Sequence, residues 1–151
     1  MNDSITSAAY LAPAHAQLPF DCNGALVRAQ CRHLATVVTV AGTVDESNVD
    51  QVIRYALRFN LPDKAFVLDL SGVDVFGAQA VRLLYAVDDA CTNAGLEWAV
   101  IPSQAVSLTL LVSRADVDFP TATTVHEALQ FFADASTARR RVLLPFFTKT
   151  A

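Results

Sequence analysis

Apolar positions along the chain repeat in two ways, one typical of buried strands and one typical of amphipathic helices. Residues His33 to Ala41 and Ala65 to Leu70 are apolar on both faces and rich in β-branched residues, which favours strands covered on both sides. Between them, apolar residues recur three or four positions apart, as on one face of a helix. This spacing predicts a helix through Val49, Val52, Ile53, Ala56 and Leu57.

The same two patterns predict the remaining elements. Short apolar runs predict strands at 25–30, 97–101 and 119–123, and helical spacing predicts helices at 78–93 and 103–113. A last helix is predicted to begin at a capping box, Thr124 to Glu127. Strands separated by helices require parallel crossovers. We therefore expect an α/β fold, with a mixed, mostly parallel sheet of about five strands and about four helices.

Polar residues and glycines mark where these elements begin and end. Asp45 or Ser47 is predicted to cap the first helix by accepting a bond from free backbone N–H groups. Ser71-Gly72 is predicted to break the second buried strand, with Gly72 at a turn that needs a free φ. Gly95 is predicted to stop the helix at 78–93.

The pattern divides the chain into a central domain with an arm and a tail. Residues 1–22 are rich in Ala, Ser and Pro and are expected to form a flexible N-terminal arm, while 23–135 form the domain. Residues 136–151 are expected to form a tail in which three arginines, Arg139 to Arg141, precede the apolar run Val142 to Phe147. An exposed apolar run is costly, so we expect it to pack on the domain or on a partner.

Composition narrows the class of protein. The chain has 151 residues, 53% of them hydrophobic, which suits one folded domain. A net charge of −4 provides no overall field that attracts nucleic acid or an anionic membrane. No apolar stretch reaches the roughly 18 residues of a transmembrane helix, and the N-terminus lacks a signal-peptide pattern. We expect a cytoplasmic protein.

The sequence offers little catalytic chemistry. It contains no P-loop, no G-x-G-x-x-G fingerprint and no G-x-S-x-G elbow. Its cysteines (Cys22, Cys31 and Cys91) and its histidines (His15, His33 and His126) lack metal-ligand spacing, so neither metal nor cofactor is expected. Asp69, near the end of a buried strand, lies where a receiver domain carries its phosphoacceptor, but the other acidic and lysine residues of such a site are missing.

The stretch from Phe66 to Leu84 resembles the signature of STAS domains, which include the bacterial anti-sigma-factor antagonists. It reads as an apolar strand, then Asp-Leu-Ser-Gly-Val, then a loop that opens a helix containing Leu-Leu. Upstream, Ala41 to Asp45 is similar to the family's Gly-x-Leu-Asp loop, and downstream Val100 to Ser103 and Phe119 to Leu129 match in spacing. The resemblance covers roughly residues 25–133.

The resemblance implies a switch loop, and this sequence departs from it. In the family, a kinase-type anti-sigma factor phosphorylates the first serine of an Asp-Ser-Ser-Gly loop. Gly77, Ala78, Gln79 and Ala80 stand at those four positions, so the phosphorylatable serine is replaced by Ala78. Either the chain is a constitutive antagonist, equivalent to the dephosphorylated state, or its surface serves another partner or ligand.

We therefore predict a non-catalytic regulator that binds another protein, an anti-sigma factor or a related one. The expected contact residues are Asp45, Ser47, Asp74, Phe76, Gly77, Ala78, Gln79 and Arg82. A small-ligand or nucleotide sensor is the alternative and predicts a pocket near Asp45, Ser71 and Gly77. An enzyme would need a nucleophile or paired acids, which the sequence does not provide. Whether the domain forms a homodimer stays open.

Overall fold

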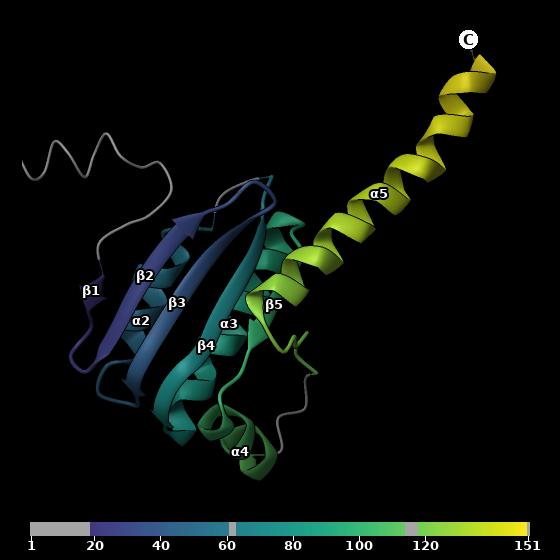
Figure 1. The fold of residues 1–151 in the computed structure, drawn as a ribbon. Coiled ribbons are helices and arrows are strands. Elements are labelled where there is room, and N and C mark those ends of the chain that lie inside the picture. The colour runs from purple at the N-terminus through teal and green to yellow at the C-terminus, as the bar shows by residue number, and fades with distance from the viewer. Residues whose placement is uncertain (1–18, 61–62, 114–117, 151) are drawn as a thin grey trace, which may run out of the picture.

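The computed structural model describes residues 19–60, 63–113 and 118–150, the last range with side chains only as far as residue 137. Figure 1 shows the elements in space. In chain order they are β1 (Phe20–Asp21), β2 (Ala25–Cys31), β3 (Ala35–Val44), α2 (Val49–Leu57), β4 (Ala65–Phe76), the 3₁₀ turn η1 (Ala78–Ala80), α3 (Val81–Ala94), β5 (Trp98–Ile101), α4 (Gln104–Ser113) and α5 (Val125–Thr150).

The strands form a single mixed sheet in the order β1-β2-β3-β4-β5. Strands β1, β2 and β3 pair antiparallel, whereas β3-β4 and β4-β5 pair parallel, with the crossovers made by α2 and α3. The predicted α/β architecture of about five strands and four helices is confirmed. The parallel part, β3 to β5, brings the carboxyl ends of β3 and β4 to the same end of the sheet.

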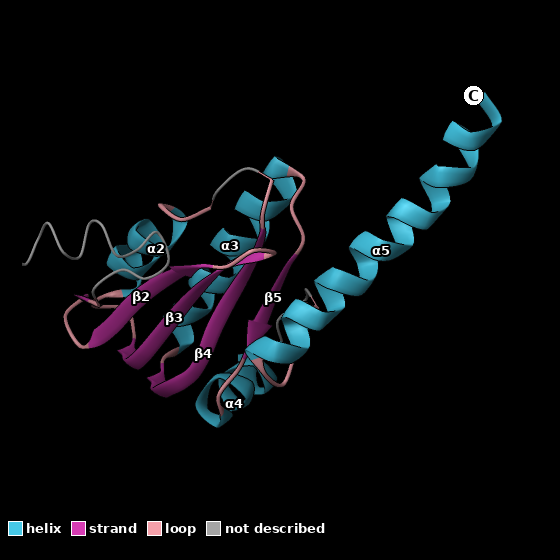
Figure 2. Cartoon of the chain, turned by 45° about the horizontal axis from the view of Figure 1, so that its top comes forward, coloured by secondary structure: helices cyan, strands magenta, loops and turns pink. Residues whose placement is uncertain are grey.

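Helices cover the two faces of the sheet unequally. Helices α2 and α3 lie side by side on one face, and the start of α5 packs on the other before the helix runs away from the sheet (Figures 1 and 2). The larger core lies under α2 and α3, where the largest fully buried side chains include Phe66, Leu68, Leu70, Leu83 and Leu84. The smaller core lies under α5, where Ala128 and Phe132 pack on residues of β3, β4 and β5.

Most predicted helices are confirmed. Val49, Val52 and Ala56 of α2 are fully buried, as are Ala80, Leu84 and Val87 ahead of and within α3. Gly95 follows α3 with a φ of 69°, the left-handed conformation expected of a glycine that ends a helix. At the start of α5, Thr124 Oγ1 accepts the Glu127 N–H at 3.0 Å, and the Glu127 carboxylate accepts the Thr123 N–H at 2.7 Å.

The predicted break at Ser71-Gly72 is wrong. Strand β4 continues to Phe76 because its register against β3 shifts twice, after Thr39 and after Gly42, so the strand bulges instead of ending. Gly72 has no positive φ. A Cβ at this position would lie 3.1 Å from the Ala41 Cβ, so close packing against β3 explains the glycine better than turn geometry.

The predicted strand at 119–123 is also wrong. Only Thr121 forms a bridge, to Val100 of β5. The Pro120 carbonyl accepts the Val100 N–H at 2.8 Å and Ala122 donates to the Val100 carbonyl at 3.0 Å. Proline has no N–H to donate, so the segment cannot build a longer ladder.

Sequence analysis missed β1 at the end of the predicted arm. Asn23 and Gly24, with φ of 51° and 110°, form a tight hairpin turn between β1 and β2. Asn-Gly is the strongest short signal for such a turn and would have found the strand. The rest of the arm, residues 1–18, lies outside the described residues, as do the side chains of Arg139 to Phe147, whose backbone continues α5.

Candidate functional site

The candidate site lies where β3 and β4 end next to each other. Strand β3 ends at Val44 and β4 at Phe76, which pair in parallel register. The Gly77 N–H donates to the Val44 carbonyl at 2.9 Å, so the two following loops stay in contact. In open α/β sheets, functional sites gather at the carboxyl ends of parallel strands.

The loop between β3 and α2 is held by a buried asparagine. Asn48 is 2% exposed, and its Oδ1 accepts the Asp45 N–H at 2.9 Å. Its Nδ2 donates to the carbonyls of Asn23 and Thr43, at 3.2 and 2.8 Å. These bonds tie the loop to both the β1-β2 turn and the end of β3. Sequence analysis missed Asn48, although an asparagine between a strand and a helix is a recognised turn signal.

Asp45 and Ser47 form a turn of their own. The Asp45 Oδ1 accepts the Ser47 N–H at 3.0 Å and the Ser47 hydroxyl at 2.6 Å. Asn48 occupies the N-cap position of α2, and no side chain makes a cap bond there. The prediction that Asp45 or Ser47 caps the helix is therefore wrong, because Asp45 bonds within the loop instead. The Asp45 carboxylate remains at the rim of the site.

The second loop continues directly into a helix. Gly77 has an extended backbone, and a Cβ there would lie 3.4 Å from the Asp45 Cβ, so the two loops touch. Ala78 and Gln79 open the η1 turn and are exposed. The two loops enclose a shallow hollow of about 480 Å³, lined by Asp45, Glu46, Ser47, Gly77, Ala78 and Gln79.

Of the eight predicted contact residues, five line this hollow and three lie elsewhere. Asp74 is exposed on the last part of β4. Arg82 Nη1 forms an exposed ion pair with Asp50 Oδ1 at 2.8 Å, which connects α3 to α2. Phe76 is only 5% exposed, so its side chain belongs to the core and is not available as a contact. Its neighbour Val75 is 51% exposed and presents an apolar side chain at the end of β4.

The chemistry of the described residues contains no evident catalytic group. They hold no cluster of three or more His, Cys, Asp or Glu side chains able to bind a metal. Asp69 accepts the Ser71 N–H at 3.0 Å and the Ser71 hydroxyl at 2.7 Å, a local contact within the bulged part of β4. Burial, with a smaller contribution from Asp88, raises the pKa of the Cys91 thiol to about 12, so this thiol stays protonated at neutral pH.

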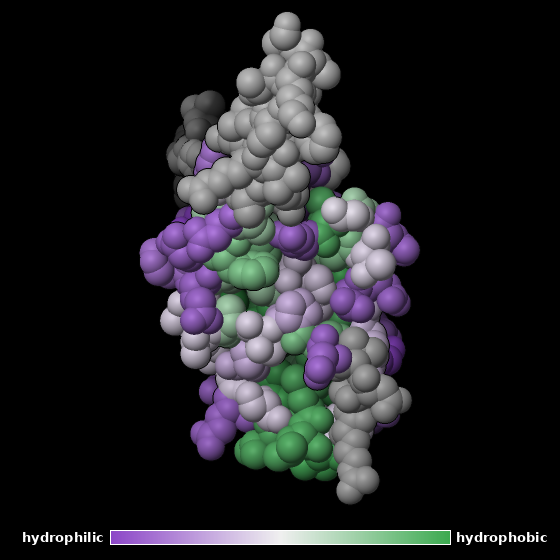
Figure 3. Space-filling view, turned by 90° about the vertical axis from the view of Figure 1, so that its right-hand side faces the viewer, coloured by the Kyte–Doolittle hydropathy of each residue, from purple (hydrophilic) through white to green (hydrophobic). Residues whose placement is uncertain are grey.

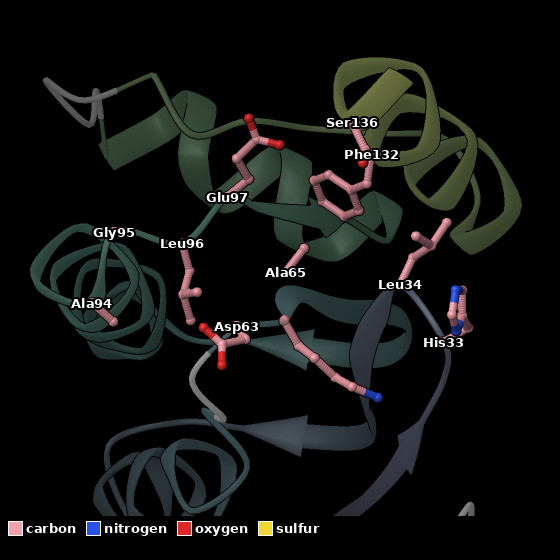
Figure 4. Close-up of a pocket in the computed structure, with 11 residues that line it drawn as sticks. His33, Leu34, Asp63, Ala65, Ala94, Gly95, Leu96, Glu97, Phe132 and Ser136 are labelled. Carbon is pink, nitrogen blue, oxygen red and sulfur yellow. The ribbon is translucent and has the colours of Figure 1, made fainter. Parts of the chain in front are cut away.

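A larger hollow of about 590 Å³ lies at the opposite end of the sheet. In Figure 4 its labelled side chains surround the Phe132 ring, with Asp63 and Glu97 toward one side and His33 toward the other. The lining also includes Lys64, whose Nζ donates to the Arg32 carbonyl at 2.6 Å. This hollow lies away from the predicted site, which sequence analysis placed near Asp45 and Gly77.

Comparison with protein-family models gives one match, to the STAS domain, over residues 27–128. The chain belongs to the STAS domain family. A relative in Mycobacterium tuberculosis, Osmosensory protein A, is 40% identical over 136 residues, which cover 87% of this chain and 85% of that protein. The family resemblance drawn from the sequence is therefore confirmed.

Solved structures share the fold of this STAS domain. A serine-to-glutamate variant of RsbS from Moorella thermoacetica has a TM-score of 0.62 and 23% identity, covering 74% of this chain and 97% of its own. An anti-sigma factor antagonist from Mycobacterium paratuberculosis has a TM-score of 0.60 and 22% identity, with coverage of 72% and 94%. A chain from the stressosome, a signal integration and transduction hub, has a TM-score of 0.55 at 19% identity, with coverage of 72% and 97%.

In this STAS domain, the residues that follow β4 carry no side-chain hydroxyl. Residues 77 to 80 read Gly-Ala-Gln-Ala, and Ala78 is exposed. Across the described residues, no helix is both long and apolar enough to span a bilayer.

Proposed function

We propose that this STAS domain is a non-catalytic, cytoplasmic regulator that binds a kinase-type anti-sigma factor and cannot be switched off at Ala78. The observation that carries the proposal is an exposed alanine, without a hydroxyl, where the family's loop carries its phosphorylated serine. The structural neighbours described as an anti-sigma factor antagonist and as RsbS support the choice of partner.

The loop contacts explain why phosphorylation would matter here. A phosphate adds about −1.5 to −2 charges and three acceptor oxygens. At position 78 it would lie in the hollow that Asp45 and Glu46 also line, so like charges would gather at the contact surface. An alanine adds no further negative charge to this surface, and Asn48 holds the neighbouring loop through three hydrogen bonds. Binding would then depend only on the amounts of the two proteins.

The experiment is isothermal titration calorimetry of the purified chain against each anti-sigma-factor kinase of its own organism, with and without ATP. We expect micromolar or tighter binding, about 8 kcal/mol, that ATP leaves unchanged. The Gly77→Asp/Ala78→Ser double variant restores two residues of the family's loop and is expected to lose affinity once ATP is added. Absence of binding to every kinase would contradict the antagonist role.

The name of the Mycobacterium tuberculosis relative supports a role in the response to osmotic stress. We expect deletion of the gene to change sigma-factor-dependent transcription after a rise in external salt. Reporter transcription measured before and after the salt shift tests this. An identical response in the deletion strain would remove osmotic stress from the proposal and leave anti-sigma-factor binding unaffected.

Small-ligand sensing is the second candidate, and the hollow around Phe132 favours it. That hollow is larger than the one between the loops, and its lining includes the acidic residues Asp63 and Glu97 together with His33 and Lys64. Such a lining suits a small zwitterion or a nucleotide. Thermal unfolding with glycine betaine or ATP, compared between the native chain and Asp63→Asn, tests it. Equal shifts in both proteins would count against a site here.

A further inference from the structure

Helix α4 exposes a row of large apolar side chains. One side of the helix packs on the core through Val106, which is fully buried, with Ala105 and Leu110 partly buried. The other side carries Leu108, Leu111 and Val112, with exposed fractions of 54%, 74% and 80%. Leu108, Leu111 and Val112 are spaced three and four residues apart, which places them on one face of the helix. In Figure 3 a hydrophobic patch covers the lower end of the molecule, where Figure 1 places α4.

This apolar face adjoins the candidate site. The Thr109 hydroxyl donates to the Phe76 carbonyl at 2.6 Å, immediately before Gly77. Val75, 51% exposed, adds an apolar side chain at the end of β4. Helix α4 therefore lies beside the loop that contains Ala78, at the same end of the sheet, and the row is on its exposed side. Contiguous exposed apolar surface of this kind marks binding sites more often than isolated apolar residues do.

The surroundings of the row are acidic. Asp45 and Glu46 lie in the loop that follows β3, and the exposed Asp74 lies near the end of β4, at the same end of the sheet as α4. Within 45–48, 74–82 and α4, all of them described, the only cation is Arg82, and Asp50 already pairs with it. A partner that covers the row must therefore bring positive charge to the rim, because like charges across an interface disfavour binding. A second copy of this chain would bring the same acidic residues.

We propose that Leu108, Leu111 and Val112 are the hydrophobic anchor of the docking surface, and that the partner presents an apolar patch bordered by Lys or Arg. The inference rests on the proposed function for the partner's identity, an anti-sigma factor, and adds to it the position and chemistry of the contact. A few well-packed side chains at the centre of an interface carry most of its binding energy, and rim charges mainly set the rate and salt dependence of association.

The test uses the anti-sigma-factor kinase that binds the native chain. Leu111→Ser is expected to weaken binding about 30-fold or more, as expected for a central anchor. Phe131→Ser is the matched control, since Phe131 is also large, apolar and 62% exposed, but lies on α5. It should leave affinity within about twofold. Urea unfolding of both variants verifies that they remain folded.

Charge reversal tests the partner's chemistry. Glu46→Lys should slow association and reduce its dependence on salt, because a basic partner loses an attraction. Faster association would overturn the basic rim.

Binding that Leu111→Ser leaves unchanged would overturn the anchor while the antagonist role stands. If the native chain binds no kinase, the proposed function fails instead, and this inference fails with it. Analytical ultracentrifugation measures the oligomeric state. If the native chain sediments as a dimer and Leu111→Ser as a monomer, the row binds a second copy of the chain, which would contradict the proposal.

Discussion

At the scale of single residues, Asn48 determines the shape of the binding loop. Its buried side chain satisfies one backbone N–H and two carbonyls from three different places in the chain. We expect Asn48→Ala to lower the free energy of unfolding by about 2–3 kcal/mol, because these groups lose their partners while staying buried. It should also weaken partner binding, since Asp45 and Ser47 lose their fixed positions. Urea unfolding and calorimetry measure the two effects.

Ser47→Ala is the control for that prediction. Ser47 lies in the same loop but is exposed, and its hydroxyl bonds only to Asp45. We expect Ser47→Ala to lower the free energy of unfolding by less than about 0.5 kcal/mol, as for most surface substitutions. Equal costs for the two variants would show that loop composition, and not burial of the Asn48 amide, governs the stability of this region.

The Cys91 thiol gives a pH dependence with a defined sign. Burial raises its pKa from the ordinary 9.0 to about 12, so the unfolded chain releases this proton at lower pH than the folded one. The stabilisation is complete below pH 9 and is lost as pH rises toward 12. We expect the free energy of unfolding to fall less steeply over this range in Cys91→Ala than in the native chain. Parallel slopes in urea titrations would contradict the assignment.

Some features of the residues near the site could be predicted from the sequence, and others could not. The position of Gly77 to Gln79 at the start of a helix could be predicted, because local patterns specify helices and their ends. The burial of Phe76 and the ion pair of Arg82 could not, because both depend on residues distant in sequence. The requirement for glycine at position 72 could not be predicted either, because it arises from close packing against Ala41 of the neighbouring strand β3.

At the scale of elements, local signals predicted most helices and the buried strands. The apolar spacing of α2 and α3 and the capping residues of α5 lie within the segments they describe, and all three helices were found. The continuation of β4 through Ser71 and Gly72 was not found, because a bulge depends on the register of the adjacent strand. The segment 119–123, expected to form a strand, does not form one, because Pro120 limits its pairing.

The cap of α5 can be tested directly. Thr124→Ala removes the hydroxyl that accepts the Glu127 N–H and should lower the free energy of unfolding by about 1 kcal/mol. Thr124→Ser keeps that oxygen and should change stability by only a few tenths of a kcal/mol. Chemical denaturation of the two variants separates the contributions. A serine variant as unstable as the alanine variant would show that the threonine methyl, not the cap bond, matters.

At the scale of the whole molecule, alternating strands and helices predicted the α/β class, because strands joined through helices form parallel crossovers. The order of the strands in the sheet was not predicted. The course of α5 was not predicted. It packs on the sheet through Ala128 and Phe132 near its start and then continues beyond the sheet to Thr150 (Figure 1). Sequence periodicity alone does not indicate which part of a long helix packs against the rest of the protein.

A pair of truncations tests this division of α5. A chain that ends at residue 137 retains every described contact of the helix, and its free energy of unfolding should stay within about 1 kcal/mol of the native value. A chain that ends at residue 124 loses Ala128 and Phe132, exposes the smaller core and should unfold at much lower urea concentration. Circular dichroism follows both transitions. Equal stability of the two chains would show that α5 is not part of the folded unit.

Strand β1 covers only the first part of the outer edge of β2. It pairs with Leu26 and Val27, while Arg28 to Cys31 pair with β3 on the inner side and, among the described residues, with no strand on the outer side. Open strand edges are templates for aggregation, and charged side chains protect them. The exposed Arg28 then acts as a gatekeeper on this edge. Loss of its charge, or of the Asn23-Gly24 turn that holds β1 in place, would favour fibril-like association without altering the buried core.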